Sequence, residues 1–166
     1  MNIKKKSENM TSEHICFQAQ EVLFKFMRSF DDKDFEIMKE CLHDKIFCDY
    51  SSFRKEEPST IRAIDYCEKR KKSLFNLTTQ HNILNVSIEE NVELEIRIVC
   101  NYIIYRFGKR FLDKKDDFFH SYGRYEFGLK PDKKTTKLKI HSIKQQVFMN
   151  DGNSKIHTGL TSTPKT

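Results

Sequence analysis

The first part of the chain repeats apolar side chains with the spacing of an amphipathic helix. From Ser12 to Phe30 the apolar residues recur three or four positions apart, which predicts a helix with one buried face. The acidic segment "DDKD" (31–34) then interrupts the pattern. Asp31 or Asp32 is placed to N-cap a second helix, because a short acidic side chain can accept hydrogen bonds from the first free backbone N–H groups.

Two further elements are expected before the pattern changes. The segment "KIFCDYSSF" (45–53) reads as a short strand. Pro58 is placed to open a third helix over about 58–75, because proline is favoured in the first turn.

The second half of the chain has the period of β-strands. Leu94, Ile96 and Ile98 alternate with charged residues, as on a strand with one buried face. Four long strands are expected, over residues 78–90, 92–108, 116–130 and 137–150. Helices followed by a meander of antiparallel strands indicate an α+β fold. A strongly curved sheet with helices laid across its concave face would enclose a pocket, the kind of half-open mouth where ligands bind.

One domain is expected over residues 12–153, since the 166-residue chain is long enough to bury a core. Residues 1–11 are polar and are expected to form a flexible N-terminus, and residues 154–166 read as a C-terminal tail.

Composition narrows the choice of partners. The net charge is +6, but Lys and acidic residues are interspersed, which predicts a mixed solvated surface and no nucleic-acid site. The basic run "EKRKK" (68–72) is interpreted as the solvated end of a helix. No apolar run approaches the roughly 20 residues of a membrane span. The five cysteines have no metal-ligand spacing, and their odd number without a secretory signal favours reduced thiols and a cytoplasmic location.

Three residues are candidates for proton transfer. His81 begins the first long strand, Asp31 lies between the first two helices, and Tyr50 ends the short strand. A carboxylate bonded to one imidazole nitrogen raises the basicity of the other, and a phenol can polarise a carbonyl. Each residue also has a structural interpretation: Asp31 as a helix N-cap, Tyr50 as a core residue, and His81 as a polar strand end.

Three segments occur in an order that is characteristic of one superfamily. They are "SFDDKDFEIMKECLHDKIFCDYSSF" (29–53), "TTQHNI" (78–83), and "HSYGRYEFGL" (120–129) followed by "KLKIHSIKQQVFMNDGN" (137–153). In this order they resemble the SnoaL-like branch of the NTF2-like superfamily, and within it they are similar to scytalone dehydratase. The resemblance implies a cone-shaped α+β barrel around a deep pocket.

The resemblance also implies roles for individual residues. In the dehydratase an Asp–His pair does the acid–base work and two tyrosines hold a water against the substrate carbonyl. Asp31, His81 and Tyr50 match the aspartate, the histidine and one tyrosine. Phe30 stands where the other tyrosine is expected, and Asn101 where a second histidine is expected. The candidate substrate-binding residues are Phe30, Phe53, Asn101, His120 and Tyr122, with His120 a candidate to replace the missing histidine.

Two functions follow from this reading. The first is a cofactor-independent and metal-independent dehydratase or isomerase acting on a hydroxy-carbonyl or cyclic small molecule. The second is a non-catalytic ligand-binding or assembly module of the same fold, because fold alone does not fix function. The resemblance further implies a homo-oligomer, either a dimer or a trimer.

Overall fold

The computed structural model describes residues 12–54, 56–90, 95–108 and 116–157. Four helices and six strands follow one another, with a final 3₁₀ turn. They are α1 (Ser12–Asp32), α2 (Phe35–Glu40), β1 (Leu42–Asp49), α3 (Ser51–Arg54), β2 (Ser59–Arg62), α4 (Ala63–Leu74), β3 (Leu77–Glu90), β4 (Ile96–Gly108), β5 (Phe119–Pro131), β6 (Leu138–Gly152) and η1 (Ser154–Ile156).

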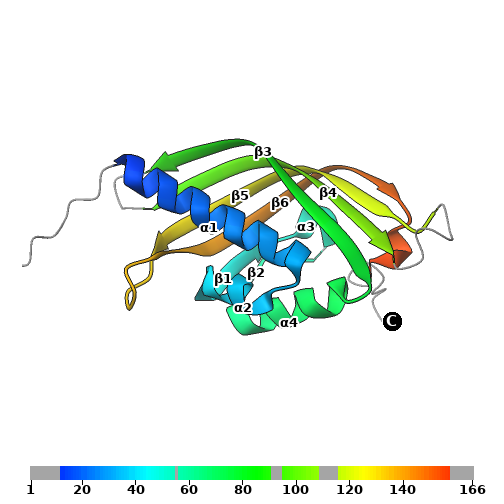
Figure 1. Cartoon of the computed structure of the whole chain (residues 1–166), viewed down its shortest axis with the longest axis horizontal. Coiled ribbons are helices and arrows are strands. Elements are labelled where there is room, and N and C mark those ends of the chain that lie inside the picture. The colour runs from blue at the N-terminus through cyan, green and yellow to red at the C-terminus, as the bar shows by residue number, and fades with distance from the viewer. Residues whose placement is uncertain (1–11, 55, 91–94, 109–115, 158–166) are drawn as a thin grey trace, which may run out of the picture.

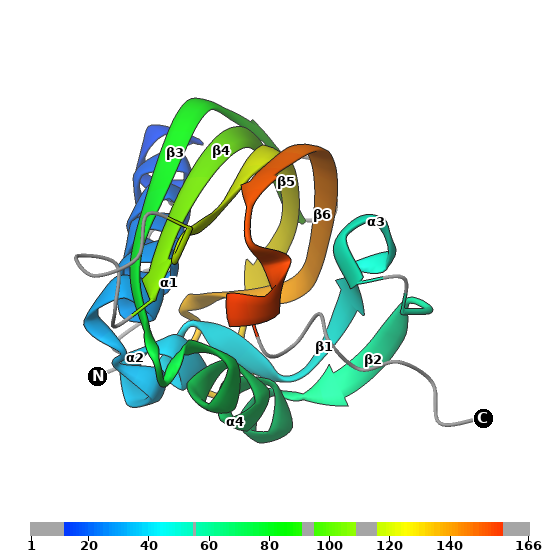
Figure 2. The same cartoon turned by 90° about the vertical axis from the view of Figure 1, so that its right-hand side faces the viewer.

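The six strands form one sheet in the order β2-β1-β6-β5-β4-β3. The four long strands are an antiparallel meander, as the sequence predicts, but β1 pairs with β6 in parallel, so the expected wholly antiparallel sheet is corrected at this point. Register shifts interrupt the pairing of β3 with β4 between Leu84 and Ser87, and the pairing of β5 with β6 between Met149 and Val147 of β6. Such bulges bend strands, and the sheet curls over as Figure 2 shows.

Helix α1 lies across the sheet and supplies much of the core (Figure 1). Its buried residues are those of the predicted apolar stripe: Ile15, Ala19, Leu23, Phe26, Met27 and Phe30. They belong to the same core as the inward side chains of β4, in which every second residue from Ile96 to Arg106 is buried. The α+β cone expected from the sequence is confirmed, with an open sheet that the N-terminal helices cover on one side.

The segments around the second and third helices differ from expectation. The N-cap of α2 is Asp34, whose carboxylate accepts a hydrogen bond from the Ile37 N–H, so neither Asp31 nor Asp32 has that role. Pro58 does not open a helix, because β2 follows it and pairs with β1, and α4 begins only at Ala63.

The end of the described chain packs inward. His157 follows η1 and is 2% exposed, so packing continues beyond residue 153 into the segment that the sequence predicts to be a tail. The expectations for residues 1–11, for Leu94 and for the tail after His157 lie outside the described residues.

Candidate active site

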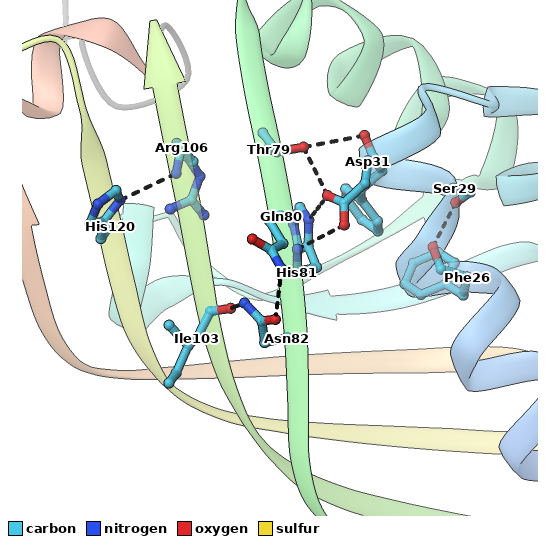
Figure 3. A network of polar contacts seen from close by, with 11 residues as sticks. Phe26, Ser29, Asp31, Thr79, Gln80, His81, Asn82, Ile103, Arg106 and His120 are labelled. Atoms are coloured by element: carbon cyan, nitrogen blue, oxygen red, sulfur yellow. Dashed lines mark hydrogen bonds and ion pairs between the residues drawn. The ribbon is translucent and has the colours of Figure 1, made fainter. Parts of the chain in front are cut away.

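Asp31 and His81 form a close pair between α1 and β3 (Figure 3). The Asp31 carboxylate lies 2.6 Å from His81 Nδ1 and accepts hydrogen bonds from the His81 backbone N–H at 2.8 Å and from the Thr79 hydroxyl at 2.9 Å. The last turn of α1 carries Asp31 to the strand, and the Phe30 ring packs on the imidazole with 4.8 Å between centroids. The pair is thus fixed by both backbone and side-chain contacts.

The surroundings set the proton positions in this pair. Burial lowers the pKa of His81, the hydrogen bond to Asp31 opposes this effect, and the nearby Arg106 adds to the lowering. Burial raises the pKa of Asp31, but the hydrogen bonds from His81 and Thr79 outweigh it, so the pKa lies below its usual value. Near pH 7 the aspartate is therefore ionised and the imidazole neutral. Because a carboxylate only accepts, Nδ1 carries the proton and Nε2 is left as the basic nitrogen.

Tyr50 lies on the wall of the same small cavity as His81. Its hydroxyl is 2.7 Å from the hydroxyl of Tyr66, which comes from α4, and both side chains are buried. Burial raises the pKa of Tyr50 well above its usual value, so the phenol keeps its proton. The cavity itself is about 20 Å³, room for about one water molecule.

Some of the predicted substrate-binding residues line the cavity, and the others lie on the outer face of the sheet. Phe30 and Phe53 line the cavity with His81. Asn101, His120 and Tyr122 do not, because their neighbours in the strand point inward and they alternate to the outer face. The ring of His120 accepts a hydrogen bond from the Arg106 backbone N–H at 3.3 Å and packs edge-on against Tyr105. His120 therefore does not take the place of the expected second histidine, because its side chain lies outside the cavity.

Several cavity residues were missed by sequence analysis. Tyr66 does not line the cavity itself, but its hydroxyl lies 2.7 Å from that of Tyr50, which does. Arg70 lies inside the run "EKRKK" but is only 8% exposed, so the interpretation of that run as solvated is wrong for this residue. Arg106 follows the buried alternation of β4 and is 4% exposed. That alternation was a usable signal, whereas nothing local marks His157.

Other features of the described part of the chain bear on partners. A groove of about 480 Å³ runs between α1, α2 and the start of β6, but no predicted site residue lines it. Among the described residues, no group of three or more His, Cys, Asp or Glu side chains is placed to hold a metal ion. No helix in those residues combines the length and apolar character needed to cross a membrane.

The sequence matches no family model and no curated protein. Solved structures are similar to it in fold. Protein Kfla4162 from Kribbella flavida is 15% identical, covers 89% of this chain and 99% of its own, and superimposes with a TM-score of 0.81. A provisionally assigned scytalone dehydratase from Novosphingobium aromaticivorans is 14% identical, with coverages of 83% and 87% and a TM-score of 0.69. The β subunit of benzoate 1,2-dioxygenase from Burkholderia mallei is 16% identical, with coverages of 84% and 92% and a TM-score of 0.62. At such low identity these likenesses establish the fold alone, and the chain has the NTF2-like, SnoaL-like fold that its motifs predicted.

Proposed function

We propose that this protein binds a small hydroxy-carbonyl or cyclic molecule and catalyses its dehydration or isomerisation without a metal or an organic cofactor. One observation carries the proposal: a buried, neutral His81, oriented by Asp31, lines the same cavity as Tyr50. A base and a hydrogen-bond donor on one cavity are the parts needed to remove a proton next to a carbonyl.

The proposed reaction begins at the basic nitrogen of His81. Nε2 takes a proton from the carbon next to the carbonyl. The electron pair of that C–H bond forms a carbon–carbon double bond, and the π pair of the carbonyl moves onto its oxygen, which gives an enolate. The Tyr50 hydroxyl donates a hydrogen bond to this oxygen as its negative charge develops. In a dehydration the enolate re-forms the carbonyl, its carbon–carbon double bond shifts to the β carbon, and the C–O bond there breaks. The imidazolium gives its proton to the departing hydroxyl, which leaves as water. In an isomerisation it returns the proton to a different carbon.

Asp31 acts through His81 rather than on the substrate. Its carboxylate fixes Nδ1 as the protonated nitrogen and stabilises the imidazolium that forms after proton abstraction. The side chain of His81 is 4% exposed and that of Asp31 is 24% exposed, so the attraction between them is only partly screened by water.

A non-catalytic binding module is the second candidate, and Phe30 at the position of an expected catalytic tyrosine favours it. A volume of about 20 Å³ holds no organic substrate, so turnover requires the cavity to open. A module that binds without turnover needs the same opening but no exchange of substrate protons.

Deuterium exchange separates the two candidates. The protein is incubated in D₂O with a panel of cyclic β-hydroxy-ketones, and loss of the proton next to the carbonyl is followed by NMR. We expect exchange or dehydration with at least one ketone, a loss of about 10²–10⁴-fold in His81→Ala, and a smaller loss in Tyr50→Phe. His43→Ala, on β1 and outside the cavity, is the control. Full exchange in both cavity variants would contradict the assignment.

We propose a homodimer or homotrimer in the cytoplasm that binds neither nucleic acid nor membranes. Sedimentation velocity of the full chain tests the oligomeric state.

A further inference from the structure

Three arginines line the cavity, and no acidic side chain accompanies them there. Arg54 comes from α3, Arg70 from α4 and Arg106 from β4. The described residues that line the cavity include no aspartate or glutamate. Glu56 is the acidic side chain that raises the pKa of Arg54 by its charge, but it is exposed and does not line the cavity. The cavity therefore concentrates positive charge without a counter-ion from its own wall.

Aromatic rings pack against these guanidinium groups. Arg70 lies 5.0 Å from the ring centroid of Tyr50 and 4.8 Å from that of Tyr66. Arg106 lies 5.4 Å from the Phe53 ring centroid. Rings over the faces of a guanidinium leave its N–H edges for hydrogen bonding, which is the arrangement that recognises planar oxyanions.

Some of these N–H groups have no hydrogen-bond acceptor among the described residues. The Nε atoms of Arg54 and Arg70 are buried and have no hydrogen-bond partner among the described residues. Arg106 donates a hydrogen bond to the Ser121 hydroxyl at 2.8 Å, which holds its side chain but leaves its charge unpaired. A buried polar group without a partner is costly, and a buried charge more so.

The arginines also remain charged despite burial and mutual repulsion. Burial and the neighbouring Arg70 lower the pKa of Arg54 to about 10. Burial lowers the pKa of Arg106 to about 10 as well, and Arg70 again contributes. Both values lie well above 7. Burial opposes the charge of Arg70 too, but its attraction to the neighbouring phenols outweighs burial and raises its pKa, so all three guanidinium groups are charged. An arrangement this unfavourable without a ligand is explained if an anion completes it.

We propose that the cavity binds a small organic anion, whose carboxylate or phosphate group takes hydrogen bonds from Arg54, Arg70 and Arg106. The rest of the ligand then lies against His81 and Tyr50, which share the cavity. As a statement about substrate this rests on the proposed function, whereas anion binding stands without it.

Entry of such a ligand requires displacement of a side chain. His157 follows a three-residue 3₁₀ turn and packs on Phe53 at 5.6 Å between centroids and on Phe119 at 6.3 Å. The other polar side chains of the cavity stand on α3, α4, β3, β4, β5 and β6, or, in the case of Tyr50, directly before α3. The three-residue turn before His157 is the shortest of these elements. His157 is therefore the group that an anion larger than water moves.

Calorimetric titration of the full chain tests the proposal with four probes. Benzoate and phenyl phosphate carry the two anionic groups, benzamide is the neutral counterpart of benzoate, and inorganic phosphate lacks an organic body. We expect at least one aromatic anion to bind more tightly than benzamide and to raise Tm. A difference between benzoate and phenyl phosphate identifies the preferred anion. Binding of inorganic phosphate alone, or equal binding of benzoate and benzamide, would overturn the proposal.

Arginine variants locate the binding. Arg106→Gln and Arg54→Gln each remove one guanidinium group and are expected to weaken anion binding by about 10- to 100-fold. The matched control is Arg97→Gln, since Arg97 also stands on β4 but faces outward and is paired with Glu89 and Glu126. Arg54 lies in the short helix α3, so its variant provides the test if Arg106→Gln does not fold. Equal binding by all three variants would show that the anion lies elsewhere.

The two proposals fail separately. If the arginine variants lose anion binding but no ketone exchanges in a manner that depends on His81, the anion site stands and the catalytic proposal does not. If neutral ketones exchange and no anion binds, the reverse holds.

Discussion

Replacement of Asp31 by asparagine is the most direct test of how the pair works. The two side chains have nearly the same shape, but the amide group donates from its nitrogen where the carboxylate accepts. In the protein, Asp31 accepts three hydrogen bonds, at 2.6, 2.8 and 2.9 Å, from the ring and backbone of His81 and from Thr79. An asparagine oxygen can keep the backbone bond, whereas its NH₂ group then faces His81 Nδ1. We expect the imidazole to respond by moving its proton from Nδ1 to Nε2.

The magnitude follows from the loss of charge in these bonds. A hydrogen bond to a charged group contributes about 1.5–3 kcal/mol, against about 1 kcal/mol for a neutral one. The amide keeps contacts with the same neighbours, so we expect Asp31→Asn to lower the free energy of unfolding by about 1.5–3 kcal/mol. Proton abstraction should fall by about 10²–10⁴-fold, because Nε2 is no longer a base.

Two measurements check this without knowledge of the substrate. The ¹⁵N chemical shifts of the His81 ring report which nitrogen carries the proton, and denaturant titration reports stability. Asp32→Asn is the control, because Asp32 is adjacent, exposed and has no role in the pair. An unchanged tautomer in Asp31→Asn, or an equal loss of stability in the two variants, would refute the reasoning.

Two other predictions concern the same cavity. Tyr66→Phe leaves the buried Tyr50 hydroxyl without its partner at 2.7 Å, and denaturant titration should show a loss of about 1–3 kcal/mol. Burial and the three arginines lower the pKa of His157 to about 2. Below pH 6.5 the unfolded chain therefore protonates this residue while the folded one does not, and the resulting stability loss is about 1.4 kcal/mol per pH unit. Between pH 7 and pH 5, His157→Gln should lose about 2 kcal/mol less than the natural protein; equal losses would contradict the burial of a neutral imidazole.

The local pattern of apolar residues was sufficient to predict most helices and strands. It failed where pairing with a distant strand determined the structure. The stripe of α1 and the alternation of β4 each follow from burial of one face, which a single segment records. The segment Ser59–Arg62 forms a strand because it lies against β1, with Ile61 opposite Ile46. That partner is not visible in the local sequence, where Pro58 indicates a helix.

Position along a strand explains which of the predicted site residues line the cavity and which do not. Ile96 and Ile98 point inward, so the odd-numbered Asn101 belongs to the outer face, and the alternation already contained this information. In β5 the sequence around His120 and Tyr122 shows no such alternation, so its inward face could not be read. The buried arginines were missed for a different reason: Arg is rarely buried without a partner, so sequence rules place it on the surface.

The arginines and the His81–Asp31 pair are linked through charge. Arg106 lowers the pKa of His81 in addition to the effect of burial, so the positive cavity makes the imidazole a weaker base when no ligand is present. An anion held by Arg106 offsets that effect, because its negative charge lies close to both groups. A ligand that brings its own negative charge would therefore strengthen the base that acts on it, while a neutral molecule of the same shape would not. If both proposals hold, the arginines select the substrate by its charge, and the negative charge of the bound ligand makes His81 a stronger base for proton abstraction.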